Sequence, residues 1–288
     1  MRAGSAVEIP QADLEKMKKI ELEMLVELDR ICRKYHIKYN ICAGTLLGAV
    51  RHKGFIPWDD DIDVRMLRRE YKKFCRVCEK ELDDSKFFLQ NKDTDPGYRW
   101  YFGRILRKGT EYVRVGQEEL EQKTGVFIDI FPSDGIPENF LTKLLYSFLT
   151  WCCRKTLWSP VGVRVEKNPL KRRVFIFLSR IPPKVPFGIL EFLSRRYNEK
   201  NCERFACIGL KKDKSIFSSQ RIQKYGLKRE WHTDLIEMEF EGHMFFAPRD
   251  YHGWLVEGFG DDYMQLPPVE KRTIHHTVSS YKLLEDVS

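Results

Sequence analysis

The chain has 288 residues, of which 42% are hydrophobic and 32% charged, and its formal net charge is +8. This length and apolar content support a folded core and exclude a wholly disordered chain. No apolar run approaches the roughly 20 residues that cross a bilayer, and the first ten residues lack the apolar stretch of a signal peptide. We therefore expect a cytoplasmic protein without a transmembrane helix.

The first part of the chain alternates helix and strand signals. Apolar residues recur at helical spacing over Leu14–Arg33, which predicts an amphipathic helix. Next come a short strand over Ile37–Cys42, a glycine-bounded turn into a helix over Gly44–Val50, a strand over Asp61–Met66 and a charged helix over Arg69–Glu81.

Two further strands are expected at Trp100–Leu106 and Gly125–Phe131, and the second is predicted to end in a turn at Pro132–Gly135. Mixed strands with interspersed helices predict an α+β core.

The composition changes over Phe140–Lys200, which holds thirteen Lys or Arg and three Glu, a net charge of +10. Aromatic residues lie between the cations, and we expect helical pieces that break at Pro160, Pro169 and Pro182-Pro183. This stretch is predicted to be an insertion. The expected organisation is a catalytic core over 1–139, the basic insertion over 140–200, and a C-terminal part over 201–288 that completes the catalytic domain.

The basic insertion has several possible uses. An ordinary helical subdomain with a solvated basic face, an anionic membrane surface, an anionic substrate and nucleic acid are all open. A membrane ranks above nucleic acid because aromatic residues alternate with basic clusters such as Lys171-Arg172-Arg173, and no nucleic-acid recognition motif is present. The protein is thus expected to contact the inner face of the membrane peripherally. A non-enzymatic, membrane-docking module is the alternative to an enzyme.

The eight cysteines are expected to be reduced thiols, because a chain of this size does not need a disulfide framework. Cys32 and Cys42 lie on apolar faces, and the adjacent Cys152 and Cys153 cannot form an unstrained bridge. Cys75 and Cys78 have zinc-like spacing but no second matched pair, so they are a weak zinc candidate.

Four carboxylates crowd into five positions at Asp59, Asp60, Asp61 and Asp63, which favours a bound cation. If Asp61–Met66 is a strand, Asp61 and Asp63 point to the same face. Oxygen ligands of this kind suit Mg²⁺ or Mn²⁺. A solvated acidic loop is the alternative, and the run lacks the downstream glycine and glutamate of a calcium-binding EF-hand loop.

Asp129 is a single acid in the apolar stretch Gly125–Phe131, where an unpaired charge would be costly. A structural salt bridge is one explanation. The other places Asp129 opposite Asp61 and Asp63, where it binds metal or accepts the proton of an attacking hydroxyl.

Phosphate contacts are expected upstream of the aspartates. Gly44 and Thr45 follow a strand and open a helix, an arrangement that presents N–H groups and a hydroxyl to phosphate. Arg51, His52 and Lys53 add cationic donors between that turn and the carboxylates, although a solvated basic turn explains them equally well.

Segment Ala43–Asp63 resembles the signature of the LicD family of phosphotransferases. It contains the glycine turn, the basic residues that follow it and the acidic run. Gly125–Pro132 resembles a second block of that family. A C-terminal block is similar over Tyr251, Phe259–Pro268, Lys271, Arg272, His275 and His276, and Arg104 lies in a looser match between the first two blocks. The family is related to fukutin-type proteins. The resemblance implies the nucleotidyltransferase fold, a mixed sheet flanked by helices, and the basic insertion is its least typical part.

The resemblance also implies an activity, the transfer of phosphocholine from CDP-choline to a hydroxyl of a cell-surface glycan or its lipid-linked precursor. Asp61 and Asp63 would hold magnesium, and Asp129 would complete the metal site or act as base. The implied nucleotide and phosphate contacts are Gly44, Thr45, Arg51, His52, Lys53 and Arg104.

Several alternatives remain open within this reading. CDP-ribitol, CDP-glycerol or CDP-ethanolamine would use the same machinery, as would nucleotidyl transfer. Choline would need an aromatic pocket, for which Trp100, Tyr101, Trp254 and Tyr263 are candidates. His275 and His276 either contact substrate or are ordinary histidines.

Overall fold

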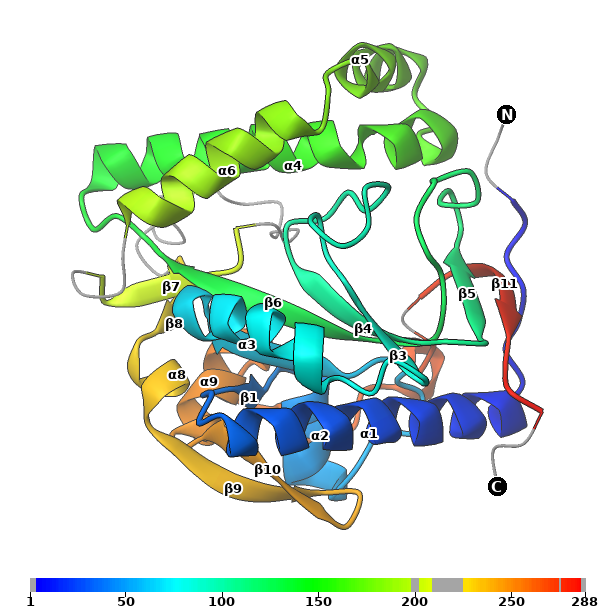
Figure 1. Ribbon diagram of the computed structural model, residues 1–288, viewed down its shortest axis with the longest axis vertical. Coiled ribbons are helices and arrows are strands. Elements are labelled where there is room, and N and C mark those ends of the chain that lie inside the picture. Colours follow the sequence, from blue (N-terminus) through cyan, green and yellow to red (C-terminus); the bar gives the residue numbers. More distant parts are fainter. Residues whose placement is uncertain (1–3, 198–201, 209–224, 275, 286–288) are drawn as a thin grey trace.

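The computed structural model describes residues 4–197, 202–208, 225–274 and 276–285 (Figure 1). Across these residues, seven strands form one mixed sheet. Its path runs through β1 (Asn40–Ile41), β2 (Asp63–Leu67), β6 (Phe127–Gly135), β4 (Gly103–Arg107) and β3 (Phe87–Gln90), with β7 (Arg204–Ala206) and β8 (Leu227–Lys228) joined to the end of β6. Strands β2 and β6 are parallel, and the other pairs are antiparallel. The predicted mixed sheet flanked by helices is confirmed.

Helices α1 (Gln11–Lys34) and α3 (Arg68–Glu81) pack on one side of this sheet (Figure 1). The amphipathic pattern of the sequence explains α1, which buries one stripe of apolar residues at helical spacing. The stripe consists of Leu14, Met17, Met24, Leu25, Leu28 and Ile31, each at most 1% exposed. The main hydrophobic core therefore lies between α1, α3 and the sheet.

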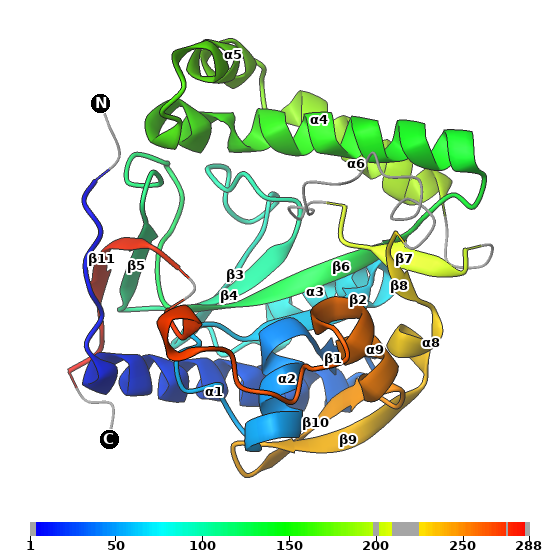
Figure 2. The same ribbon diagram turned by 180° about the vertical axis from the view of Figure 1, so that it is seen from behind.

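The chain after residue 225 returns to the first half of the fold. Helix α2 (Ala43–His52) packs against α9 (Tyr251–Phe259), and both lie nearer the viewer in Figure 2. The remaining elements here are the hairpin of β9 (Leu235–Phe240) and β10 (His243–Pro248), α8 (Glu230–Thr233), the 3-10 helix η2 (Val269–Lys271), and β11 (Val278–Lys282), which pairs with β5 (Glu111–Arg114). The C-terminal part thus packs on the core that precedes the insertion.

The turn predicted at Pro132–Gly135 is wrong, because β6 continues through these residues and is buried throughout. The antiparallel partner β4 ends opposite Ile130, so the next residues of β6 have β2 on one side only. Proline is tolerated in a strand where its missing N–H is not needed by a second neighbour. Beyond it, Asp134 and Gly135 pair with β7.

The segment predicted to be a basic insertion forms α4 (Phe140–Val165), α5 (Pro169–Ser179) and α6 (Lys184–Arg196) at one end of the molecule (Figures 1 and 2). The break predicted at Pro160 is wrong, because α4 runs through it. Proline deprives the Thr156 carbonyl of its usual helical donor. The hydroxyl of Ser159 donates to that carbonyl at 2.6 Å, which replaces the missing bond.

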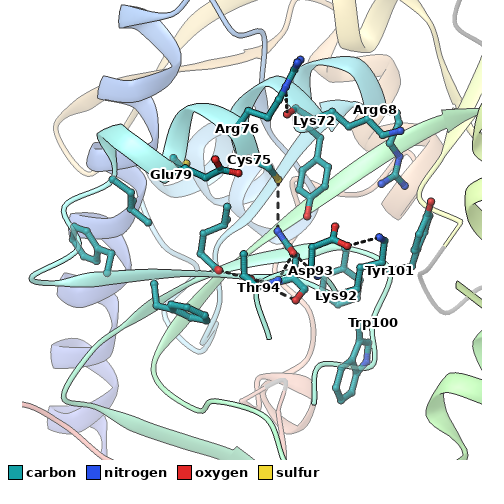
Figure 3. A pocket seen from close by; sticks show the side chains of 18 of the residues that line it. Arg68, Lys72, Cys75, Arg76, Glu79, Lys92, Asp93, Thr94, Trp100 and Tyr101 are labelled. Carbon is teal, nitrogen blue, oxygen red and sulfur yellow. Dashed lines mark hydrogen bonds and ion pairs between the residues drawn. The ribbon is translucent and has the colours of Figure 1, made fainter. Parts of the chain in front are cut away.

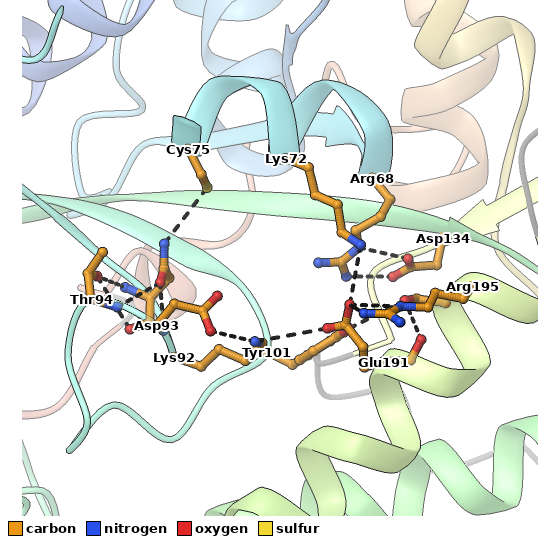
Figure 4. A network of polar contacts seen from close by, with 12 residues as sticks. Arg68, Lys72, Cys75, Lys92, Asp93, Thr94, Tyr101, Asp134, Glu191 and Arg195 are labelled. Atoms are coloured by element: carbon orange, nitrogen blue, oxygen red, sulfur yellow. Dashed lines mark hydrogen bonds and ion pairs between the residues drawn. The ribbon is translucent and has the colours of Figure 1, made fainter. Parts of the chain in front are cut away.

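The insertion is attached to the core by a second apolar cluster and by ion pairs. Tyr101 packs in that cluster with residues of α4 and α6. Within the core, near this attachment, Arg68 at the start of α3 makes a bidentate pair with buried Asp134 of β6, with distances of 2.7 and 2.8 Å. Lys72 reaches Glu191 of α6 at 3.3 Å (Figure 4).

All eight cysteines lie in described residues and are free thiols. Burial raises the pKa of Cys75 to about 11, and Asn91 contacts its sulfur at 3.8 Å. Cys75 and Cys78 do not belong to any cluster of metal-type donors within the described residues. In the same part of the chain, no helix combines the length and the apolar character needed to cross a membrane.

Candidate active site

The starts of the parallel strands β2 and β6 bring two aspartates together. Asp63 and Asp129 are direct neighbours in the ladder, so their side chains leave the same face of the sheet. The Asp129 N–H donates to the Ile62 carbonyl at 2.9 Å, and the Cys42 N–H donates to the Asp63 carbonyl at 3.0 Å. These bonds fix the start of α2 and both aspartates relative to one another.

The acidic run before β2 is a loop rather than part of the strand. The predicted strand start at Asp61 is wrong by two residues, because β2 begins at Asp63. Carboxylate oxygens of Asp59, Asp60 and Asp61 lie within 4.8 Å of one another, close enough to share one metal ion. The tightest carboxylate group in the described residues therefore includes Asp59 and Asp60, which the predicted ligand set of Asp61, Asp63 and Asp129 leaves out.

This crowding disfavours negative charge. Burial, the neighbouring Asp63 and the other aspartates raise the pKa of Asp61 well above its usual value. Burial and Asp129 raise the pKa of Asp63 to about 8, and burial and Asp60 raise that of Asp59 to about 6. A buried set of carboxyl groups with raised pKa values fits a site for a hard divalent cation, which would hold them ionised.

Asp60 is the exception within the loop. Burial acts to raise the pKa of Asp60, but the contacts with His276 and Tyr112 outweigh burial, and the pKa lies below its usual value. The Tyr112 hydroxyl donates to Asp60 Oδ2 at 2.7 Å, and His276 Nδ1 lies 3.2 Å from the same oxygen. His276 Nε2 is 3.6 Å from Asp61. The C-terminal segment thus closes over the acidic loop, while His275 lies outside the described residues.

Asp129 also has cationic neighbours. Arg104 Nε donates to Asp129 Oδ1 at 2.5 Å from the adjacent position on β4. Arg114 Nη2 lies 3.9 Å from Asp129 Oδ2. Both guanidinium groups also lie over the Phe127 ring, with centroid distances of 4.0 and 4.8 Å. The salt bridge considered as an explanation for Asp129 is present, and it places Arg104 and Arg114 beside the acidic site.

The glycine turn is built into the same cluster. A methyl group on Gly44 would lie 2.5 Å from an Asp59 oxygen, so a side chain here would displace the Asp59 carboxylate. Thr45 is 4% exposed, and its hydroxyl accepts the Asp63 N–H at 2.8 Å. Gly44 and Thr45 therefore pack against the aspartates at the N-terminus of α2.

Arg51, His52 and Lys53 lie at the other end of α2, roughly 10 Å or more along the helix axis from Gly44. Arg51 Nη1 donates to the carbonyls of Tyr263 and Gln265 at 3.0 and 3.1 Å. Burial and then Arg51 lower the pKa of His52. In this structure Arg51 holds the C-terminal segment in place, and phosphate binding by these three residues stays a prediction.

Sequence reasoning missed Glu21, Tyr112 and Arg114 at this site, and it left the role of His276 open. Glu21 of α1 is 2% exposed, and burial, Asp60 and Asp59 raise its pKa well above the usual value. Tyr112, Arg114 and His276 come from β5 and from the segment that leads into β11. The pairing of β5 with β11 brings these residues to the site, and no short motif encodes that pairing.

A separate cavity of about 680 Å³ lies between α3, β3 and α6 (Figure 3). Arg68, Lys72, Trp100, Tyr101 and Glu191 are among its lining residues. The predicted catalytic, metal and phosphate-binding residues all lie in the described part of the chain, and none of them lines this cavity, whereas the choline-pocket candidates Trp100 and Tyr101 do. It opens beside the insertion, whereas the aspartates lie at the opposite end of β2.

The fold and the site together define a class. A mixed sheet, paired aspartates on parallel strands and a glycine turn that opens a helix characterise a nucleotidyltransferase-type domain. In agreement, residues 36–159 match the family model for the LicD/FKTN/FKRP nucleotidyltransferase domain. The chain is also 30% identical to the lipopolysaccharide cholinephosphotransferase LicD of Haemophilus influenzae, over 94% of this chain and 98% of that protein. The chain belongs to the LicD family.

Two rickettsial relatives are similar over shorter stretches. An uncharacterized protein of Rickettsia prowazekii is 44% identical over 59% of this chain and 70% of its own length. An uncharacterized protein of Rickettsia typhi is 30% identical over 42% of this chain and 37% of its own length. The family membership confirms the prediction of a LicD-like phosphotransferase enzyme.

Proposed function

We propose that this enzyme transfers a phospho-alcohol group, phosphocholine in the first instance, from a CDP-alcohol to a hydroxyl of a cell-surface glycan or its lipid-linked precursor. The reaction is proposed to depend on Mg²⁺ or Mn²⁺. The observation that carries this proposal is the meeting of Asp63 and Asp129 on parallel strands beside the Asp59–Asp61 loop. The name of the Haemophilus influenzae relative supports the choice of phosphocholine and of lipopolysaccharide as the acceptor class.

The donor set supports a hard divalent cation. Asp61 and Asp63 are proposed ligands; Asp59 and Asp60 have carboxylate oxygens within 4.8 Å of Asp61, and Asp129 is the neighbour of Asp63 in the ladder. Carboxylate oxygens are the ligands that Mg²⁺ prefers. When bound, such an ion neutralises negative charge on the diphosphate of the donor. The raised pKa values of Asp61 and Asp63 support this assignment, because the chain alone provides too little positive charge for both to ionise.

Cationic side chains beside the aspartates suit the phosphate groups of the donor. Arg114 Nε and Nη2 are buried and make no hydrogen bond within the described residues, and we propose that they donate to phosphate oxygens when the donor binds. Arg104 lies next to it and shares the contact with Asp129. Thr45 and the first turn of α2 face the same loop and are proposed to orient the diphosphate.

The proposed transfer is a single in-line displacement. The acceptor oxygen forms a new bond to the phosphorus that carries the alcohol, and the bond from that phosphorus to the bridging oxygen of CMP breaks. CMP leaves with the bonding electron pair, and the hydroxyl proton passes to a carboxylate, for which Asp129 is the proposed acceptor. Phosphoryl-type transfer depends mainly on positioning and charge neutralisation, which this site would supply with a divalent cation bound.

The aromatic residues that could form a choline pocket do not form one cluster. Tyr101 packs under α6, whereas Trp254 and Tyr263 belong to the main core. Trp100 lies near Arg104, with 5.9 Å from the guanidinium to the ring centroid. The four aromatic candidates therefore do not gather in one cage. CDP-ribitol, CDP-glycerol and CDP-ethanolamine remain rival donors, and nucleotidyl transfer remains the rival reaction.

Isothermal titration with CDP-choline, the competing CDP-alcohols and CMP, with and without Mg²⁺, tests the proposal. We expect metal-dependent binding of CDP-choline, and Asp63→Asn is expected to weaken it at least tenfold. Asp84→Asn is the matched control, because the Asp84 side chain is 93% exposed. Tighter binding of another CDP-alcohol would reassign the donor. No nucleotide binding under any metal condition would contradict the proposed activity.

A further inference from the structure

The helices of the insertion expose apolar side chains in a regular pattern. Each of α4, α5 and α6 has three large apolar residues at positions i, i+4 and i+7, which form one stripe along the helix. The stripes are Leu141, Leu145 and Phe148 on α4, Leu170, Val174 and Phe177 on α5, and Val185, Ile189 and Phe192 on α6, and these side chains are 39–71% exposed.

These stripes are not used by the fold. The core contacts of α4 come from its opposite side, where Tyr146, Cys153 and Leu157 are buried. Helix α6 likewise buries Leu190 and Leu193. Of the eighteen large apolar side chains that the described residues expose, eleven lie on these three helices. Such a concentration of exposed apolar groups marks an interaction surface.

The segment that carries the stripes is also rich in exposed cations. Residues 140–197 contain twelve Lys or Arg and two Glu, a net charge of +10. The exposed cations are Lys167, Lys171, Arg172, Arg173, Arg180, Lys184, Arg195 and Arg196. Of the two acids, Glu191 is partly buried and already pairs with Lys72 and Arg195. This surface is therefore both apolar and strongly positive.

We propose that the nine stripe residues and these eight cations form a docking face for an anionic lipid bilayer. The apolar stripes enter the boundary between headgroups and acyl chains, and the cations contact lipid phosphates. Amphipathic helices with a basic polar side bind membranes in this way. Helices α5 and α6, of 11 and 13 residues, are too short to span a bilayer, so they lie along its surface.

Other occupants fit this face less well. A second copy of the chain would bring another +10 against the first, which opposes self-association. Nucleic acid would match the cations but would leave nine apolar side chains in water. An anionic bilayer satisfies both properties at once. The argument depends only on α4–α6 and not on the identity of the donor or acceptor.

Co-sedimentation of the full chain with lipid vesicles tests this proposal. Vesicles of phosphatidylcholine alone are compared with equal parts of phosphatidylcholine and phosphatidylglycerol, at low and at high salt. We expect binding to the anionic vesicles that weakens as salt rises, and weak binding to the neutral ones. The absence of binding to anionic vesicles at low salt would overturn the proposal.

Two sets of variants separate the apolar and the charged contributions. Leu145→Ser, Val174→Ser and Phe192→Ser combined should weaken binding by about tenfold or more. Lys171→Glu, Arg173→Glu and Lys184→Glu combined should do the same and should also reduce the salt dependence. Because all six residues are exposed, circular dichroism and the melting temperature should stay unchanged.

Matched controls change the same chemistry elsewhere on the surface. Val26→Ser, Met244→Ser and Val269→Ser remove exposed apolar residues, and Lys19→Glu, Lys80→Glu and Lys282→Glu reverse exposed charges. These controls should retain vesicle binding. An equal loss in controls and test variants would overturn the assignment to α4–α6. Self-association that the serine variants abolish, without lipid binding, would assign the face to a second copy.

Discussion

The two ends of the β2–β6 strand pair carry different arrangements of buried charge: a group of like charges at one end and an ion pair at the other. At the start of the strands, Asp63 and Asp129 are like charges with three more aspartates beside them. Just past the end of β2, Arg68 and Asp134 form a bidentate pair of opposite charges. The second arrangement is complete within the chain. The first lacks positive charge, as the raised pKa values of Asp61 and Asp63 show.

This difference separates a structural site from a binding site along the same two strands. A buried ion pair stabilises only while both partners are present, since removal of one leaves an uncompensated charge. A buried group of like charges destabilises the fold until a ligand of opposite charge arrives. Mutations at the two ends should therefore have opposite effects on stability.

The largest effect is expected for Asp63→Asn. Loss of a charged group that the transition state needs should lower kcat/KM for phospho-alcohol transfer by about three orders of magnitude, equivalent to about 4 kcal/mol. In the metal-free protein at pH 8, the same change removes repulsion with Asp129 and should raise the free energy of unfolding. Product formation and urea denaturation measure the two quantities, with Asp84→Asn as the control. A variant that loses stability without metal would contradict the contrast between the two ends.

At the other end, Arg68→Met should destabilise the protein by about 3 kcal/mol, because it leaves Asp134 buried and unpaired. The neighbouring Arg69→Met is the control, since the Arg69 side chain is 76% exposed and should contribute less than about 1 kcal/mol. Urea denaturation of both variants provides the comparison. Equal free energies of unfolding for Arg68→Met and Arg69→Met would show that the buried pair contributes no more to stability than the exposed one.

The acidic end should also make stability depend on pH. Asp63 has a pKa of about 8 in the folded chain and roughly 4 when unfolded. Between these values the folded state keeps a proton that the unfolded state has lost, so stability of the metal-free protein falls as pH rises and levels off above pH 8. Mg²⁺ should oppose this fall.

Melting curves at pH 6 and pH 8, with Mg²⁺ or with a chelator, test whether stability falls as pH rises and whether Mg²⁺ opposes that fall. The melting temperature should rise with Mg²⁺ by about 3 °C more at pH 8 than at pH 6. The Asp63→Asn variant should lose most of this difference. A larger effect of Mg²⁺ at pH 6 would contradict the assignment of the raised pKa to the metal site.

The sequence predicted the meeting of Asp63 and Asp129 at the acidic end, but it did not predict the Arg68–Asp134 pair at the other end. The acidic run at Asp61 and Asp63 and the single acid Asp129 in an apolar stretch predicted that these carboxylates would meet, and strand pairing brings Asp63 and Asp129 together. The partner of Arg68 was hidden because Asp134 follows Pro132, whose local preference is for a turn. The strand persists there because β2 and β7 supply tertiary contacts that local propensity does not contain.

Long-range contacts account for the rest of what was missed. His276 meets Asp60 across 216 positions of sequence, through the pairing of β11 with β5. Glu21 belongs to an amphipathic helix, where periodicity alone placed acids on the solvent side. Ser159 compensates for Pro160 inside α4 through one hydrogen bond. The surroundings of His276 and Glu21 depend on which surfaces meet in the folded chain, whereas the Ser159 bond is local and spans only three positions.

The smallest effect is expected for Glu21→Gln, which tests how far the acidic end extends. Within the described residues, Glu21 Oε2 is buried and makes no hydrogen bond, and Asp60 and Asp59 help to raise its pKa. Removal of its residual charge should weaken Mg²⁺ binding by only about twofold to fivefold, with kcat almost unchanged.

Glu23→Gln is the matched control, because Glu23 lies on the same helix with its side chain 38% exposed and paired with Lys86 and Arg107. Calorimetric titration with Mg²⁺ should distinguish the two variants. If Glu21→Gln abolishes Mg²⁺ binding, this carboxylate is part of the metal site itself, and the like-charge group reaches from the β2–β6 pair into α1. If it behaves as Glu23→Gln does, Glu21 is a packing group and the acidic end stops at the Asp59–Asp61 loop and Asp63.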